Sequence, residues 1–328
     1  MHAASLSDDL APSGQSPLSE ERRRSPWRVW SDSFLPASTR RIEAFHHNFD
    51  EHPLMALPRL AQLAESLWPR GQCRFMVPEA TVASPLASVF RLRSPDGRHI
   101  DDVFRQLDRP GTWVSLYNVE SDPDYRALLA EVMAAACATI GRAHRGIFRV
   151  CGYLFISAPP SVTPFHIDRE NNFWLQLRGH KTLTVWDRQD REVVSADAVE
   201  TFILTGSLDD VKLEGAMRAR GHAFESGPGD GVFFPSTSPH MTVSDTSWTR
   251  PGDAVAVSLG VVFYTAETLR DARVHLCNRA LRRLSLPARF PGEHRWLDAS
   301  KAPVGALLAR YRKAWPDVTG WSYGLDRH

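Results

Sequence analysis

The apolar positions follow a helical period in the first part of the chain. Leucines at 57, 60, 63 and 67 recur at the spacing that places side chains on one helix face, so residues 54–67 are predicted to be a helix. Asp122 and Pro123, an N-cap followed by a first-turn proline, predict a second helix over residues 122–137. The patterns predict short strands and turns at 72–98, a short helix at 99–108 and a strand at 113–120. Residues 27–145 are therefore expected to be mixed α+β elements.

From residue 146 the pattern becomes strand-like. Short apolar runs are separated by Gly, Pro and Asp turns without a helix-length crossover, and they lie at 147–157, 172–178, 182–187, 231–235, 241–244 and 254–265. Such strands pair antiparallel, and a set of them is typical of a barrel or jelly roll that encloses one small-molecule site. The predicted fold class is mainly β within an α+β chain, with the barrel at residues 146–265.

Three segments outside these elements have their own patterns. Residues 1–26 are rich in Ser, Pro and charge and are predicted to be a disordered tail. Residues 195–220 have a weaker pattern with a short helix at 198–202, and so long an insertion could act as a wall or lid over the barrel mouth. Residues 266–328 are predicted to be a C-terminal helical segment, with helices at 266–284 and 303–314. The pattern leaves open whether these helices pack on the barrel or form a homodimer interface.

The composition narrows the class of protein. The 328 residues carry a formal net charge of +1, which offers no general attraction to nucleic acid or to an anionic membrane. The four cysteines are scattered without a C-x-x-C pair, so neither a zinc finger nor a disulfide scaffold is indicated. No apolar run reaches transmembrane length, and the N-terminus lacks the apolar core of an export signal. We expect a soluble cytoplasmic protein with no nucleic-acid and no membrane partner.

The strongest chemical signal is a histidine and a carboxylate one residue apart. If His166 and Asp168 lie on one strand, their side chains share a face, because strand side chains repeat every two residues. His240 ends a second stretch, in which a glycine-rich turn leads into a short apolar strand. Two histidines and one carboxylate on adjacent positions of an octahedral metal leave three positions open, which is the facial triad of non-haem Fe(II) oxygenases. We therefore predict that His166, Asp168 and His240 are the metal ligands and the catalytic residues.

Two other histidine-containing stretches are less suited to a metal. His99 and Asp101 have the same spacing, but they follow a turn and lead into a polar run without paired strands or a downstream lysine. We interpret His99 as a surface histidine. Residues 45–52 hold three histidines directly before the predicted helix at 54–67, so these histidines are expected to cap or solvate that helix.

The residues around the first histidine match a known pattern, Thr-Pro-x-His-x-Asp followed by Asn-Phe, Gln, Gly and Lys. The matching residues are Thr163, Pro164, His166, Asp168, Asn172, Phe173, Gln176, Gly179 and Lys181, with a Pro-Gly-Asp turn at 228–230 and His240 beyond. In this the chain resembles the JmjC and cupin-like Fe(II)/2-oxoglutarate oxygenases, particularly the group of the factor-inhibiting asparaginyl hydroxylase. The resemblance covers roughly residues 110–265. It implies a double-stranded β-helix, the jelly-roll barrel of the cupins, with Fe(II), 2-oxoglutarate and O2 as cofactor and cosubstrates.

The resemblance also implies how the cosubstrate is bound. In the family, the lysine on the strand after the His-x-Asp strand pairs with the distal carboxylate of 2-oxoglutarate, a role carried over to Lys181. Thr163 resembles a threonine whose hydroxyl assists the same carboxylate, while Asn172 resembles an asparagine near the metal-bound end. A dianion in a largely apolar barrel needs such a cation and such donors.

Three further residues are candidates for the cosubstrate pocket. Either Tyr117 or Tyr153 could supply the phenol that the asparaginyl hydroxylase uses. The asparagine that this relative carries on its last barrel strand has no counterpart here, and Ser258 is the nearest polar candidate.

The implied reaction is hydroxylation of an unactivated C–H bond, with release of succinate and CO2. Arg169, Glu170 and Asn171 follow the metal aspartate and are predicted to face the barrel mouth, where they could recognise an amino-acid-like group; a local Arg169–Glu170 ion pair is the alternative. The family likeness favours an amino-acid residue in a peptide, protein or tethered substrate. Two alternatives stay open: the same chemistry on a free small metabolite, and a cupin-like sensor or regulator without turnover.

Overall fold

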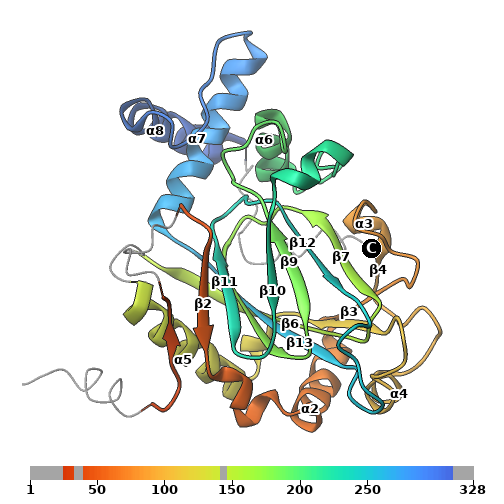
Figure 1. The fold of residues 1–328 in the computed structure, drawn as a ribbon. Helices are drawn as coiled ribbons and strands as arrows, with labels where there is room; N and C mark the ends of the chain where they lie inside the picture. Colours follow the sequence, from red (N-terminus) through yellow and green to blue (C-terminus); the bar gives the residue numbers. More distant parts are fainter. Residues whose placement is uncertain (1–24, 33–39, 141–145, 313–328) are drawn as a thin grey trace, which may run out of the picture.

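Two antiparallel β-sheets, packed face to face as a sandwich, form the body of the protein (Figure 1). The computed structural model describes residues 25–32, 40–140 and 146–312. The larger sheet has nine strands in the order β1-β2-β11-β8-β13-β6-β5-β3-β4, and the smaller has four in the order β10-β9-β12-β7. The predicted jelly-roll class, with N-terminal α+β elements and C-terminal helices, is confirmed. Most of the predicted tail at 1–26 lies outside the described residues.

Every pairing between these strands is antiparallel. The strands are β1 (Val29–Trp30), β2 (Glu43–His47), β3 (Cys73–Met76), β4 (Phe90–Arg91), β5 (Trp113–Leu116), β6 (Phe148–Ser157), β7 (Ser161–His166), β8 (Asn171–Arg178), β9 (Lys181–Val185), β10 (His222–Ser226), β11 (Asp230–Phe234), β12 (His240–Ser244) and β13 (Ala256–Tyr264).

The larger sheet separates the hydrophobic core from the interior of the sandwich. β13 lies between β6 and β8, and all nine of its residues are buried, which explains its continuous apolar run. On β8, Phe173, Leu175 and Leu177 belong to the main core, whereas Asn172 and Trp174 line the interior cavity. Side chains alternate along a strand, so one strand contributes to both the core and the cavity.

Helices α2 (Leu57–Leu67) and α5 (Pro123–Ile140) cover the outer face of the larger sheet, and their leucines share a core with β8 and β13. Asp122 caps α5 as predicted, since its carboxylate accepts hydrogen bonds from the backbone N–H groups of Asp124 at 2.9 Å and Tyr125 at 3.3 Å. The remaining helical segments are α3 (Leu86–Val89), α4 (Ile100–Arg105), α6 (Ala196–Thr205), α7 (Ala266–Arg283), α8 (Arg295–Arg312), and the 3-10 turns η1 (Phe49–Glu51), η2 (Pro53–Met55), η3 (Trp68–Arg70), η4 (Val119–Ser121) and η6 (Gly215–Arg220).

The C-terminal helices α7 and α8 pack on each other, and α7 also packs on α6 (Figure 1). The predicted start of the last helix near residue 303 is wrong, because α8 begins at Arg295 and continues through Pro303. Packing on α7 compensates for the hydrogen bond that a proline inside a helix removes. Gly305 permits this close approach, since a Cβ there would overlap with the carbonyl group of Arg273. A homodimer interface on these helices stays a prediction.

The histidine-rich stretch at 45–52 differs from its prediction. His46 and His47 lie in β2, where His46 pairs with Asp230 of β11 and His47 with Val29 of β1, instead of leading into a helix. His52 is the N-cap of the short turn η2, where its Nδ1 accepts a hydrogen bond from the backbone N–H of Leu54 at 3.2 Å, and Nδ1 of His47 accepts one from Phe49 at the start of η1. β2 and β11 are far apart in the sequence, so local periodicity did not reveal this strand. Among the described helices, none has both the length and the apolar character needed to span a membrane.

Candidate metal centre and cosubstrate cavity

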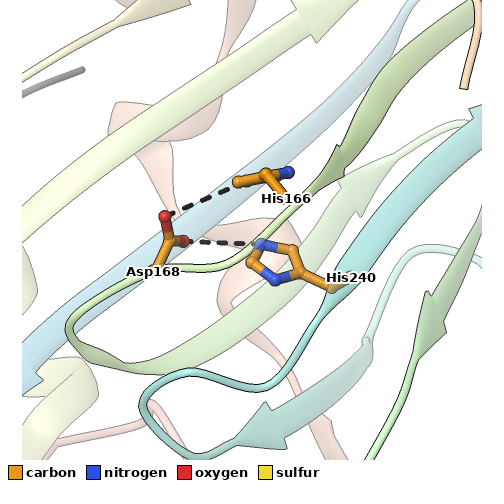
Figure 2. Close-up of side chains that lie close together, drawn as sticks. All are labelled: His166, Asp168 and His240. Atoms are coloured by element: carbon orange, nitrogen blue, oxygen red, sulfur yellow. Dashed lines mark ion pairs between the residues drawn. The ribbon is translucent and has the colours of Figure 1, made fainter. Parts of the chain in front are cut away.

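His166, Asp168 and His240 converge on one point of the smaller sheet (Figure 2). His166 is the last residue of β7 and His240 the first of β12, and the two are direct cross-strand partners. Asp168 lies in the loop beyond β7, so the expectation that it shares a strand face with His166 is wrong. Its carboxylate oxygens lie 3.9 Å from Nε2 of His166 and 3.4 Å from Nε2 of His240.

Both imidazoles are held in the tautomer that a metal ligand needs. Nδ1 of His166 lies 2.7 Å from the carbonyl oxygen of Pro164, and Nδ1 of His240 lies 3.0 Å from that of Ser238. A carbonyl oxygen only accepts, so Nδ1 carries the proton and Nε2 keeps its lone pair. Burial, together with the neighbouring His240, lowers the pKa of His166 to about 4. His166 is therefore a neutral ligand at physiological pH.

The donor set fits a divalent transition metal. The three ligand atoms lie within 4.8 Å of one another, and adjacent ligands around a metal with bonds of about 2.1 Å lie about 3 Å apart, so small side-chain adjustments suffice. Two imidazoles and one carboxylate suit Fe(II) and leave coordination positions for other molecules. This is the one cluster of its kind within the part of the chain that the structure describes.

The triad opens into a cavity between the two sheets. The space between the lining side chains is about 570 Å³, a figure that includes open solvent at the mouth. Its lining is apolar apart from a few converging polar groups, and comprises Leu86, Phe90, Tyr117, Tyr153, Phe155, Thr163, His166, Asp168, Asn172, Trp174, Lys181, Leu183, Phe234, His240 and Thr242. No sequence pattern indicated Leu86 and Phe90, which come from a segment separated from the triad by more than seventy residues.

Lys181 supplies the cation of this cavity. It is the first residue of β9 and only 4% exposed. Burial lowers its pKa to about 7, and no carboxylate among the described residues forms an ion pair with it. A buried ammonium without a counter-charge is costly, so Lys181 is suited to an anionic ligand that brings its own charge.

Four other residues predicted to bind the cosubstrate also line the cavity. Thr163 and Asn172 line the cavity, and Oδ1 of Asn172 is buried without a hydrogen-bond partner. Tyr117 and Tyr153 both line it, with ring centroids 4.8 Å apart, so the structure does not choose between them. Burial raises the pKa of both phenols, which therefore stay protonated and able to donate hydrogen bonds.

Ser258 lies outside the cavity lining. Its hydroxyl donates to Oε1 of Gln176 at 2.8 Å, and the two residues are cross-strand partners. On β13, Gly260 pairs with Trp174, and a Cβ at this glycine would lie 3.4 Å from Asn172 Oδ1. A Cβ at that distance makes an ordinary van der Waals contact with the amide.

Arg169, Glu170 and Asn171 are directed away from the cavity. The guanidinium of Arg169 donates to the carbonyl oxygens of Phe202 at 2.7 Å and Ile203 at 3.2 Å, at the C-terminal end of α6. Glu170 accepts from the hydroxyl of Tyr264 at 2.6 Å, and the Asn171 amide bonds to three different segments. These contacts explain the three side chains better as anchors of the Asp168 loop than as substrate ligands.

We expect the Arg169→Gln variant to loosen α6 without changing 2-oxoglutarate affinity. Hydrogen bonds from a charged donor contribute about 1.5–3 kcal/mol, so amide hydrogen exchange in residues 196–205 should accelerate by roughly 10-fold or more. Exchange measured by mass spectrometry tests this, with the exposed Arg178→Gln variant as the control. Unchanged exchange in α6, with weaker 2-oxoglutarate binding, would restore a ligand-binding role for Arg169.

His99 is placed as predicted, on the surface. Its side chain is 57% exposed, and Nδ1 faces the backbone N–H of Asp101 at 3.5 Å as the N-cap of α4. We expect the His99→Ala variant to retain metal content and activity and to lose less than about 1 kcal/mol of stability, as for a weak cap. Metal analysis and thermal unfolding check this; loss of the metal would show that the wrong His-x-Asp pair had been assigned.

Comparison with known proteins finds a likeness to solved structures. No family model and no curated protein matches the chain. The ribosomal oxygenase YcfD of Escherichia coli aligns with 12% identity and a TM-score of 0.42, over 85% of this chain and 67% of that one. Its complex with cobalt and 2-oxoglutarate aligns with 12% identity and a TM-score of 0.42 over 88% and 70%. Its complex with cobalt and succinic acid aligns with 14% identity and a TM-score of 0.41 over 88% and 69%.

The chain spans about two thirds of the length of these structures. The class of protein, a jelly roll with a His-Asp-His metal site, therefore rests on the sheets and side chains of the chain itself.

Proposed function

We propose that the protein is an Fe(II)/2-oxoglutarate-dependent oxygenase. The observation that carries this proposal is the placement of the triad and of Lys181 on one cavity. A non-catalytic sensor of the same fold needs neither open metal positions nor a buried ammonium, so both features favour turnover. The buried cation also favours a cosubstrate with a second anionic group.

His166, Asp168 and His240 would hold the metal. Bound Fe(II) would supply the activation of O2, coupled to decarboxylation of 2-oxoglutarate to succinate and CO2 and to hydroxylation of a C–H bond. The Nδ1–H groups of the two histidines, anchored on Pro164 and Ser238, fix the ring orientations before the metal arrives. Preorganised ligands reduce the reorganisation that metal binding requires.

The remaining polar residues would orient 2-oxoglutarate. Lys181 and the Thr163 hydroxyl bind the distal carboxylate, while Asn172 and the phenol of Tyr117 or Tyr153 donate near the other end. The apolar walls, including Trp174 and Phe234, exclude water and strengthen these charge-assisted contacts.

We assign the substrate to amino-acid residues in a peptide, protein or tethered carrier, with a free small metabolite as the second possibility. The family resemblance of the Thr163–Lys181 stretch supports this class. The side chains of 169–171 add no support, because they bond to Phe202, Tyr264 and Thr268 and not to the cavity.

An anaerobic titration with Fe(II) and 2-oxoglutarate tests the proposal. We expect saturable binding of 2-oxoglutarate that requires the metal, followed by slow succinate formation when air is admitted without substrate. Candidate peptides are then screened for acceleration of succinate release. Metal binding without 2-oxoglutarate binding would reject the oxygenase and leave the sensor.

A further inference from the structure

A second, smaller cavity lies beside the loop that carries Asp168. It is bounded by the loop after Asp168, by the segment that precedes His240 and by α7, and its lining comprises Arg169, Arg188, Ile203, Ser236, Thr237, Tyr264, Thr268, Asp271, Ala272 and His275. It offers about 10 Å³ to the centre of a water-sized particle, close to the minimum that holds one such particle. The cavity therefore has room for one water molecule or one small ion.

Three deeply buried side chains of this lining contain polar atoms that have no hydrogen-bond partner. They are Nε of Arg188, Oγ1 of Thr237 and both ring nitrogens of His275. The three residues are 5%, 2% and 1% exposed. Buried polar atoms are nearly always hydrogen-bonded in folded proteins, so three around one cavity indicate an occupant.

The chemistry of these groups indicates an acceptor. Nε–H of Arg188 can only donate, and the hydroxyl of Thr237 is free to do so. The carboxylate of Asp271 also lines the cavity, but it is engaged by Arg188 at 3.0 Å and faces Arg270 at 3.5 Å. The Asp271 carboxylate is therefore already paired and does not serve as the acceptor for Arg188 Nε–H and the Thr237 hydroxyl.

The charged side chains of the cavity lining, Arg169, Arg188 and Asp271, sum to one positive charge. Burial lowers the pKa of His275, and the positive charges of Arg188, Arg191 and Arg282 lower it further. The imidazole therefore stays neutral and has one N–H to donate. Arg191 lies over the ring of Phe290, with its guanidinium carbon 3.8 Å from the ring centroid, and the His275 ring packs on the same phenylalanine. Both Nη atoms of Arg191 are buried without a hydrogen-bond partner. A positive field favours an anion over a neutral water molecule.

We propose that this cavity binds a small monovalent inorganic anion of the halide type, held by Nε–H of Arg188, the Thr237 hydroxyl and an N–H of His275. The anion neutralises the excess positive charge and satisfies donors that the protein leaves unpaired. This site does not depend on the oxygenase reaction.

The anion site is linked to the metal site through the backbone. The N–H of Thr237 donates to the carbonyl oxygen of Asp168 at 2.8 Å, and Thr237 has a φ of 63°, a region that β-branched residues rarely adopt. An anion on the Thr237 hydroxyl would hold this residue in place, and with it the loops that carry Asp168 and His240. Anion binding should therefore stabilise the folded protein even without metal.

Crystals grown with sodium bromide in place of chloride test the site directly. We expect an anomalous bromide peak inside the cavity, within hydrogen-bond distance of Thr237 Oγ1 and Arg188 Nε. A fully occupied water molecule there, without anomalous signal at the bromide edge, would overturn the proposal and identify a hydration site.

Thermal unfolding of the metal-free protein gives a second test. At constant ionic strength, replacing gluconate by chloride should raise Tm by about 3 °C at a chloride concentration ten times the dissociation constant. The Thr237→Val variant, which removes only the hydroxyl, should lose this chloride-specific shift. Thr184→Val serves as the control, because Thr184 is a buried threonine that does not line the cavity. Equal shifts in all three proteins, or none in the wild type, would reject the site.

Discussion

Replacing Asp168 by alanine is expected to abolish succinate formation while the fold is retained. The carboxylate is the only acidic ligand of the triad, and it lies between the two Nε2 atoms. Metal affinity should fall by more than about 100-fold, since even the loss of an outer-shell partner reduces it roughly 10–100-fold. His166→Ala should have the same consequence. Metal content, circular dichroism and succinate release measure the three parts of this expectation.

The chain contains a matched control for this experiment. Asp101 has the same His-x-Asp spacing but lies in the first turn of α4, where it faces the exposed His99. Asp101→Ala should retain metal and activity and lose at most about 1 kcal/mol of stability. Wild-type succinate formation in Asp168→Ala would disprove the assigned metal site, whatever the behaviour of Asp101→Ala.

The Lys181→Met variant is expected to be more stable than the wild type and to lose 2-oxoglutarate binding. Methionine fills a similar volume without a charge, and removing the buried ammonium should stabilise the ligand-free protein by on the order of 2–4 kcal/mol at neutral pH. Truncating the partner of a buried carboxylate costs several kcal/mol, so the Kd of 2-oxoglutarate should rise by at least about 100-fold. Thermal unfolding and calorimetric titration measure the two effects.

The pH dependence gives this expectation a definite sign. The pKa of Lys181 is lowered from 10.5 to about 7 in the folded protein. Between these two values the unfolded chain binds more protons, so the stability of the wild type rises with pH. The stability of the Lys181→Met variant lacks this rise with pH. The excess of its stability over that of the wild type should be largest at and below pH 7 and vanish above pH 10.5. Binding of 2-oxoglutarate to the wild type near pH 8 should also take up a proton, because the carboxylate restores the charged lysine.

Lys212→Met is the control, since Lys212 is exposed. It should change neither stability nor cosubstrate affinity. If Lys181→Met bound 2-oxoglutarate as tightly as the wild type, Lys181 would have no role in cosubstrate binding and the sensor function would regain support.

The local patterns of the sequence were sufficient for most elements and for the metal ligands. Asp122 and Pro123 placed the start of α5, and the apolar run at 254–265 placed β13, because capping and burial of a central strand depend on neighbouring residues. The His-x-Asp spacing and the glycine-rich turn before His240 indicated the three residues of the triad, and the pairing of β7 with β12 brings them together.

The tertiary structure decided which side chains share a cavity. Both tyrosines line it, Ser258 bonds to Gln176 outside it, and the residues after Asp168 turn outward to α6 and Tyr264. The positions along β8 and β13 depend on strand register, and the paired residues of these two strands lie roughly eighty to ninety positions apart in the sequence, with an irregularity between Val257 and Ser258. A shift of one residue in such a pairing exchanges the two faces of a strand. Sequence spacing therefore determines which residues are able to reach the site, and the pairing of the sheets determines which residues lie in it.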